Sequence, residues 1–196
     1  MDQFEILEQD GRLITVLVKN MNFNRINLLR HAMLGYIPTY AVEYVTFYEN
    51  SSDRENEALA TRFGSIPIDQ STPDLEDDLT IRVDFRNLNE SQEPLSITTG
   101  DIPELQFSSD DILITELTYG QSVICDLTIK LGYGKDHVKW RPVSSVAIQN
   151  QGNGEFILKF KTLNMLPAAD IMILAFNHLD DVIEDVAPTK FSKVVE

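Results

Sequence analysis

The apolar stretch near the end of the chain restricts the fold more than any other segment. Residues 167–186 read PAADIMILAFNHLDDVIEDV, and Pro167 suits the first turn of a helix. Residues 171–176 are all apolar, so apolar side chains point to every side of that helix before a narrower stripe resumes at Leu179. A helix of this kind must be covered on all sides. The sequence therefore predicts that the chain's own sheet covers one side and a second chain covers the other.

Composition indicates a globular protein of one or two small domains. The chain has 196 residues, of which 43% are hydrophobic and 24% are charged, enough to bury a core. No apolar run reaches the roughly 18 residues of a membrane helix, and the acidic start MDQFEILEQD lacks the features of a signal peptide. We therefore expect an intracellular, soluble protein. Cys125 is the single cysteine, which excludes an internal disulfide and a paired-cysteine zinc site.

Charge is distributed unevenly along this acidic chain. The formal net charge is -15, which disfavours direct binding of nucleic acid because that binding depends on lysine and arginine neutralising phosphates. Between Glu49 and Glu116 the sequence holds 17 Asp or Glu, 4 Arg and no Lys. Residues 130–141 reverse this balance, with three lysines and one arginine against Asp136 alone. The basic segment predicts a local docking surface, and no membrane partner is expected.

Apolar periodicity and turn residues predict an α+β fold. Two β-rich runs within residues 4–20 flank Asp10-Gly11, which predicts a hairpin. Residues 25–36 predict a helix capped by Asn22 or Asn24. A strand at 39–50 and a short helix before Gly64 follow. Period-two alternation then predicts short strands at 79–85, 95–98, 112–117 and 121–131, which suggest a mostly β subdomain. A last pair of strands is predicted at 143–150 and 154–163.

The segment LGYGKDHVKW, residues 131–140, is the strongest candidate for chemistry, yet it matches no catalytic motif. A phosphate-binding P-loop requires serine or threonine after G-K, and here Asp136 follows Lys135. The pattern favours a tight turn that leaves an edge strand. A nucleotide-binding enzyme that uses this loop is kept as an alternative hypothesis. No catalytic residue, metal ligand or cofactor is predicted from the rest of the chain.

The histidines and the cysteine fit structural roles. The chain has three histidines without metal-ligand spacing, at His31, His137 and His178. Cys125 alternates with apolar residues inside a strand pattern, which predicts a core thiol.

Two ordered motifs resemble the alpha-like subunits of multisubunit RNA polymerases. Residues 24–68 resemble the segment of the archaeal D subunit, and of its counterpart in eukaryotic RNA polymerase II, that runs from an N-x-L-R-R helix through P-T-x-A and E-N-x-S to A-x-R-x-G-x-I-P-L. Residues 132–143, GYGKDHVKWRPV, are similar to the family's G-x-G-K-x-H-A-K-W-x-P. The order of elements matches the family across nearly the whole chain.

The resemblance implies a two-part α+β fold and a non-catalytic role. Residues 1–48 and 142–196 would form a dimerisation domain, a sheet packed on two helices as in the N-terminal domain of the bacterial alpha subunit. Residues 49–141 would form an inserted β-rich domain. The family pairs with a smaller alpha-like, L-type subunit, and the heterodimer is the platform for the two large catalytic subunits and small accessory subunits. A compact archaeal protein, or one encoded by a large DNA virus, fits this chain. Its expected location is the cytoplasm, a viral factory or the virion, or the nucleus if the source is eukaryotic.

The resemblance also supplies candidate partner-binding residues. Arg30 occupies the family's arginine position in the first helix, and His31 replaces the second basic residue. The sequence does not separate interface from core among the apolar candidates Leu28, Leu29, Met33, Ile171, Leu174, Phe176 and Ile183. The loop residues implied to face other polymerase subunits are Gly134, Lys135, His137, Lys139 and Trp140. Some members carry zinc or iron–sulfur cysteines, which cannot be transferred to this chain. A homodimeric adaptor with the same fold is the second alternative.

Overall fold

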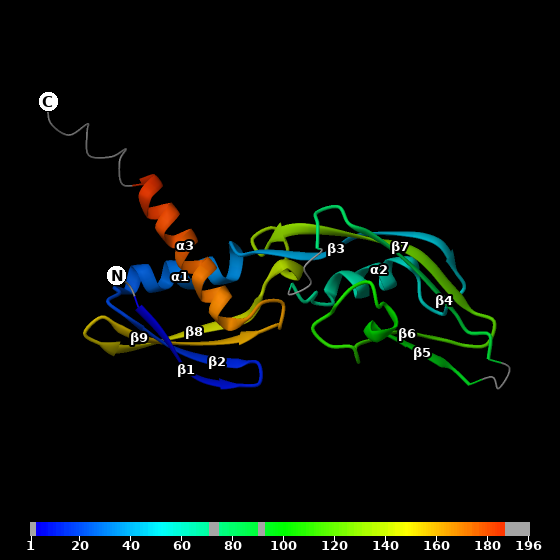
Figure 1. The fold of residues 1–196 in the computed structure, drawn as a ribbon, viewed down its shortest axis with the longest axis horizontal. Coiled ribbons are helices and arrows are strands. Elements are labelled where there is room, and N and C mark those ends of the chain that lie inside the picture. The colour runs from blue at the N-terminus through cyan, green and yellow to red at the C-terminus, as the bar shows by residue number, and fades with distance from the viewer. Residues whose placement is uncertain (1–2, 71–74, 90–92, 187–196) are drawn as a thin grey trace, which may run out of the picture. The chain divides into compact units, whose positions relative to one another are not determined.

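The computed structural model describes residues 3–70, 75–89 and 93–186, without the side chains of Gln3 and of 183–186. The chain forms two compact units (Figure 1). The first contains residues 1–38 and 133–196, and the second contains residues 39–132. No helix in the described ranges has the length and apolar character needed to cross a membrane.

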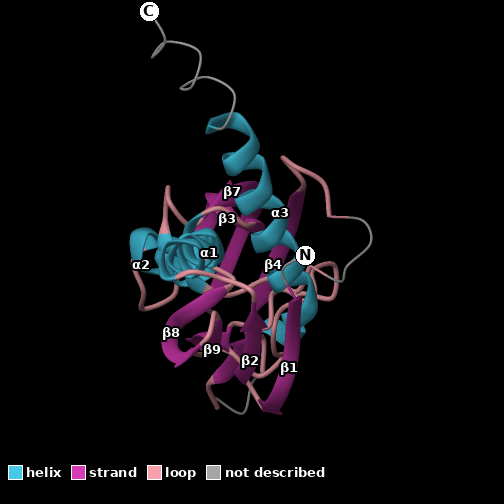
Figure 2. Cartoon of the chain, turned by 90° about the vertical axis from the view of Figure 1, so that its left-hand side faces the viewer, coloured by secondary structure: helices cyan, strands magenta, loops and turns pink. Residues whose placement is uncertain are grey.

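The first unit is an antiparallel sheet with two helices on one face. Its strands are β1 (Gln3–Asp10), β2 (Leu13–Lys19), β8 (Val143–Gly152) and β9 (Glu155–Thr162), in the spatial order β1-β2-β9-β8. The helices α1 (Phe23–Gly35) and α3 (Ala168–Val186) lie on the same side of this sheet (Figure 2). The predicted sheet on two helices is therefore present.

Local sequence signals set the ends of these elements. Gly11 has a φ of 55° in the β1–β2 turn, a conformation that glycine adopts without steric cost. The Asn22 side chain accepts a hydrogen bond from the Arg25 amide at 2.9 Å, so Asn22 rather than Asn24 caps α1. The predicted hairpin and helix are thus confirmed.

The core of the first unit lies between the sheet and the helices. Alternate residues of β2 and β9 point toward α1 and α3, as the period of a strand requires. Burial of each large apolar side chain contributes about 1.5–3 kcal/mol relative to exposure. The most deeply buried members include Ile14, Val16, Val18, Ile26, Leu29, Met33, Val143, Leu158, Phe160, Ile171, Met172 and Ala175.

The second unit is rich in strands and contains one α-helix in its described part. A three-stranded sheet has the order β3-β7-β4, from β3 (Pro38–Asn50), β7 (Ser122–Tyr133) and β4 (Thr80–Arg86). The strands β5 (Leu95–Thr98) and β6 (Leu113–Leu117) form a separate pair. The helix α2 (Asn56–Ser65) contributes Leu59 and Phe63 to the core of this unit.

The compact units divide at other residues than the sequence predicted. The expected boundaries followed residues 48 and 141, whereas the units divide after Pro38 and Gly132. The first boundary differs because β3 runs unbroken from Pro38 to Asn50 and pairs with β7. The second differs because the segment after Gly132 is hydrogen-bonded to the end of α1. The roles of the units as dimerisation and inserted domains stay predictions.

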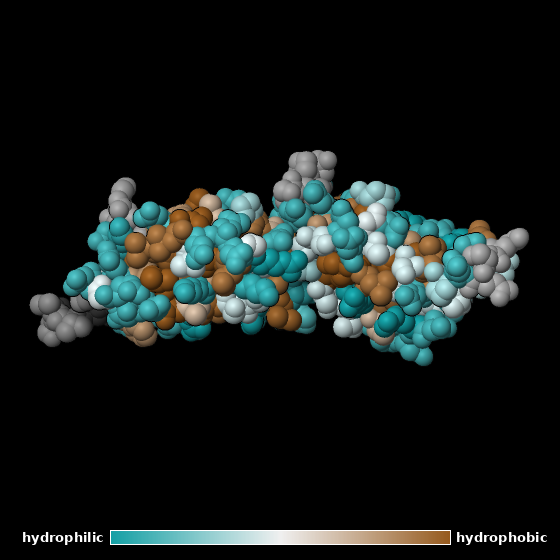
Figure 3. Space-filling view, turned by 90° about the horizontal axis from the view of Figure 1, so that it is seen from below, coloured by the Kyte–Doolittle hydropathy of each residue, from teal (hydrophilic) through white to brown (hydrophobic). Residues whose placement is uncertain are grey.

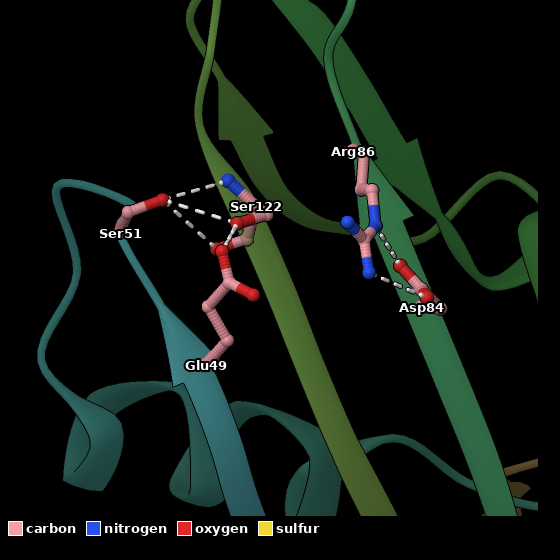
Figure 4. A network of polar contacts seen from close by, with 5 residues as sticks. All are labelled: Glu49, Ser51, Asp84, Arg86 and Ser122. Carbon is pink, nitrogen blue, oxygen red and sulfur yellow. Dashed lines mark hydrogen bonds and ion pairs between the residues drawn. The ribbon is translucent and has the colours of Figure 1, made fainter.

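Polar contacts close one end of the β3-β7-β4 sheet (Figure 4). The Ser51 amide donates to the Ser122 carbonyl oxygen at 2.9 Å, and the Ser122 amide donates to the Ser51 hydroxyl at 2.8 Å. The Ser122 hydroxyl donates to the Glu49 carboxylate. On β4, the Arg86 guanidinium donates to Asp84 at 2.7 Å and lowers the pKa of that carboxyl. The contacts of Ser122 with Glu49 and Ser51 join the end of β3 to the start of β7.

Cys125 is a core thiol, as predicted. It lies on β7 with no exposed surface, and burial raises the pKa of its thiol to about 12. Near neutral pH the thiolate, which is the reactive form, is essentially absent.

We therefore expect Cys125 to react far more slowly with a thiol reagent in the folded protein at about pH 8 than in concentrated guanidinium chloride. Because the chain has one cysteine, the rate of colour release from an aromatic disulfide reagent measures this directly. Equal rates in the two solvents would contradict the burial of the side chain.

Candidate partner-binding surface

A groove of about 300 Å³ runs between α1 and α3. The α1 side is lined by Leu28, His31 and Ala32 and by Tyr36, which directly follows the helix. The α3 side is lined by His178, Leu179 and Val182. Ala32 and Leu179 are buried, whereas Leu28, Tyr36 and Val182 are 46%, 42% and 37% exposed. Apolar side chains grouped at the surface of a helix pair are typical of a contact with another protein.

The structure separates the apolar candidates that the sequence left together. Leu29, Met33 and Ile171 have no exposed surface and belong to the core of the first unit. They support the two helices and offer no atoms to a partner. Leu28 is the predicted residue that lies in the groove.

The remaining apolar candidates lie on α3. Leu174 and Phe176 are half-buried and pack against the core, and the Phe176 ring stacks on Phe4 with centroids 5.7 Å apart. The side chain of Ile183 lies outside the described residues. Ile173, which was not selected as a site residue, is exposed. Within the described part of the chain, α3 is therefore covered on one side, and its cover by a second chain stays a prediction.

Arg30 is held by its neighbours on α1. Its Nε donates to Asn27 Oδ1 at 3.1 Å, and one terminal nitrogen lies 3.2 Å from His31 Nε2. His31, which stands in place of the family's second basic residue, is thus a neighbour of Arg30 at the groove. A separate ion pair joins the two helices, between Arg25 and Asp180 at 3.7 Å.

The loop after β7 is hydrogen-bonded to the end of α1. The Lys135 amide donates to the Gly35 carbonyl oxygen at 3.0 Å. A Cβ at Gly134 would overlap the Leu34 carbonyl oxygen and crowd Arg141. Gly134 has no positive φ, so its role differs from the one expected for a tight turn. Glycine is required here because the loop approaches the helix too closely for a Cβ atom. A left-handed backbone conformation is not the reason.

Lys135 links this loop to the groove. Its Nζ lies 5.5 Å from the centroid of the Tyr36 ring and 5.3 Å from that of Tyr133. The other neighbour of Tyr36 is His178, whose ring stacks on it at 4.5 Å. Since α1 has no basic residue in its last turn, Lys135 also supplies a cation close to the negative end of the helix dipole. Groove and loop therefore form one continuous surface.

Trp140 lies inside the unit, where the sequence predicted a displayed residue. It ends a short 3₁₀ helix, Val138–Trp140, whose first turn is capped by His137 Nδ1 accepting from the Lys139 amide at 3.2 Å. Trp140 is 9% exposed; Lys139 Nζ lies 4.6 Å from the centroid of its ring, and the His137 ring approaches it edge-on. Lys135, Asp136 and His137 are exposed, so they are the accessible charged and titratable groups at this part of the loop.

No three His, Cys, Asp or Glu side chains in the described ranges lie close enough together to hold a metal ion. The surface formed by the groove and the loop is apolar with a cationic end, which suits recognition of another protein.

Comparison with known proteins identifies the family. No family model matches the chain. The DNA-directed RNA polymerase subunit Rpo3 of Pyrococcus horikoshii is 30% identical over 214 aligned residues, which span 100% of this chain and 79% of that protein. The chain belongs to the Rpo3 family of DNA-directed RNA polymerase subunits. The resemblance to the archaeal alpha-like subunit, inferred from two motifs, is thereby confirmed.

Other Rpo3 proteins match a shorter part of the chain. The Rpo3 subunits of Pyrococcus furiosus and Archaeoglobus fulgidus are 33% and 32% identical over 71% and 74% of the chain. The matched regions span 56% and 59% of those two proteins, little more than half of their length. The groove and the loop therefore belong to a chain of the Rpo3 family, whose members are named as RNA polymerase subunits.

Proposed function

We propose that this chain is a non-catalytic assembly subunit of a DNA-directed RNA polymerase, which pairs through α1 and α3 with a smaller alpha-like, L-type subunit. The observation that carries the proposal is the groove between the two helices, whose rim exposes Leu28, Tyr36 and Val182 to water. Membership of the Rpo3 family indicates that the enzyme to which the subunit belongs is a DNA-directed RNA polymerase.

Pairing would cover the side of α3 that the sheet leaves open. Ile173 and Val182 of α3 and Leu28 of α1 would lose their contact with water. Each aliphatic side chain that becomes fully buried contributes about 1.5–3 kcal/mol, from which the cost of association must be subtracted. Several such residues are therefore needed, and the two helices provide them.

The large catalytic subunits and small accessory subunits would join the pair through the loop after β7. Lys135, Asp136 and His137 are among its exposed groups, and backbone hydrogen bonds to Gly35 or Tyr133 hold all three in place. The net charge of -15 suits a platform that does not contact DNA. The protein would act inside the cell, in the compartment where transcription takes place.

Co-expression with an L-type subunit tests the proposal. We expect a stable 1:1 complex in size-exclusion chromatography with light scattering. A chain that stays monomeric beside the L-type subunit would refute the pairing. Sedimentation of the chain alone decides the homodimeric alternative, since an isolated stable dimer with no affinity for the L-type subunit would favour an adaptor. Titration with ATP and GTP in a calorimeter tests the nucleotide-binding alternative.

A further inference from the structure

The sheet of the first unit has a second face, opposite the helices. Side chains alternate along β2 and β9, so the residues between the buried ones point away from α1 and α3. Leu13 is 48% exposed there, and Leu17 and Ile157 are half-buried. None of these three residues belongs to the core of the first unit, between the sheet and the helices. Figure 3 views the molecule from this side, and in the half that holds this sheet brown apolar atoms lie between teal polar ones.

Strand register places two lysines beside this aliphatic patch. Lys161 lies opposite Leu13 and Lys159 lies opposite Thr15, and both lysines are exposed. On their other side, β8 offers the small uncharged residues Ser145 and Ala147. No residue of the described ranges forms an ion pair with Lys159 or Lys161. The chain has 31 Asp and Glu residues, yet among the residues that the structure describes this pair of positive charges has no carboxylate partner.

Carboxylates on the same face lie on the far strand and at the start of β9, where Glu155 precedes Ile157. Glu8 and Asp10 of β1 pair with Thr15 and Leu13, so β2 separates them from the lysines of β9. At the Leu13 end of this face, β1 is therefore acidic, β2 is uncharged and β9 is basic. Complementary charge around an apolar centre selects a partner and speeds its association.

We propose that this face docks a polymerase subunit other than the L-type partner, through a segment in which carboxylates adjoin aliphatic side chains. The carboxylates contact Lys159 and Lys161, and the aliphatic groups cover Leu13, Leu17 and Ile157. The inference rests on the proposed function, because it assigns a second partner to the same assembly subunit. Since this face and the α1–α3 groove lie on opposite sides of one sheet, both partners bind at once.

Charge reversal on β9 tests the docking face. The variant Lys159→Glu/Lys161→Glu is assembled with the L-type subunit, and each large catalytic subunit is then titrated onto the immobilised pair. We expect unaltered pairing with the L-type subunit and a loss of about tenfold or more in affinity for one large subunit. The wild-type affinity should also fall as salt concentration rises.

Glu8→Lys is the matched control. It changes charge on the same face, but on the acidic strand β1, and should leave the affinity for that large subunit unchanged or raise it. Circular dichroism of both variants confirms that they are folded. If charge reversal unfolds the protein, Lys159→Gln/Lys161→Gln is titrated instead, with the same expected direction.

The outcomes separate this inference from the proposed function. Failure of the wild-type chain to pair with the L-type subunit overturns the proposed function itself. Normal pairing, together with wild-type binding of both large subunits by the charge-reversed variant, overturns the docking face alone. Self-association that disappears in the charge-reversed variant would assign the face to a second copy of the chain. Binding of a labelled DNA duplex through the two lysines would likewise overturn a protein partner.

Discussion

Replacing Leu28 by aspartate is expected to abolish pairing with the L-type subunit while the protein stays folded. Leu28 lines the α1–α3 groove and is 46% exposed, so the isolated chain tolerates a charge there. In the complex the carboxylate would be buried without a partner, which costs several kcal/mol. Since each 1.4 kcal/mol is tenfold in affinity, we expect a loss of about 100-fold or more, measured by calorimetry or by co-elution.

Two comparisons make the Leu28 result specific. Leu88→Asp adds the same charge at a 74% exposed leucine of the second unit and should leave pairing unchanged. Leu174→Asp is less informative, because Leu174 packs partly against the core and its replacement would destabilise the unpaired chain as well. Wild-type pairing by the Leu28 variant would show that the groove is not the dimer contact.

Gly134→Ala should destabilise the first unit by about 3 kcal/mol, the upper part of the range for overpacking. The added methyl group would overlap the Leu34 carbonyl oxygen, which is backbone at the end of α1 and cannot move without opening the helix. The loop would lift away from α1, and Lys135 would leave the Tyr36 ring. Urea unfolding of the purified protein measures the loss.

Gly35→Ala provides a control within the same contact. The Cβ at this position would lie 3.7 Å from the nearest atoms of Lys135, an ordinary van der Waals distance. Because alanine also loses less backbone entropy than glycine in a helix, this variant should be neutral or more stable by up to about 1 kcal/mol. Equal destabilisation by the two variants would mean that the loop does not rest on the end of α1.

Local signals explain why the main elements could be predicted. The Asp10-Gly11 turn and the Asn22 cap act within four residues of chain, so the sequence displays them directly. The unit boundaries depend instead on pairing between strands more than 70 residues apart, β3 and β7, as the Ser51–Ser122 hydrogen bond illustrates. Residues 39–50 were predicted as one strand, but composition and turn residues do not indicate that this strand pairs with β7 and so belongs to the second unit.

The candidate site was predictable by segment but not by residue. Leu28 and Leu29 are adjacent and equally apolar, yet one is exposed and the other is buried. Their separation depends on how α1 is rotated against the sheet, which requires the tertiary contacts. The burial of Trp140 was missed for a related reason, since it depends on how the loop packs in the folded unit, which the sequence pattern does not display. Resemblance to the family supplied the segments, and packing decided the individual roles.

The position of Trp140 gives the protein a built-in spectroscopic reporter. It is the only tryptophan of the chain, it belongs to the first compact unit, and it is shielded by Lys139 and His137. Emission excited at the red edge of the absorption band therefore originates from the first unit alone, whereas circular dichroism sums over both units. During denaturation, a difference between the two signals would reveal that one unit melts before the other, without any label being attached.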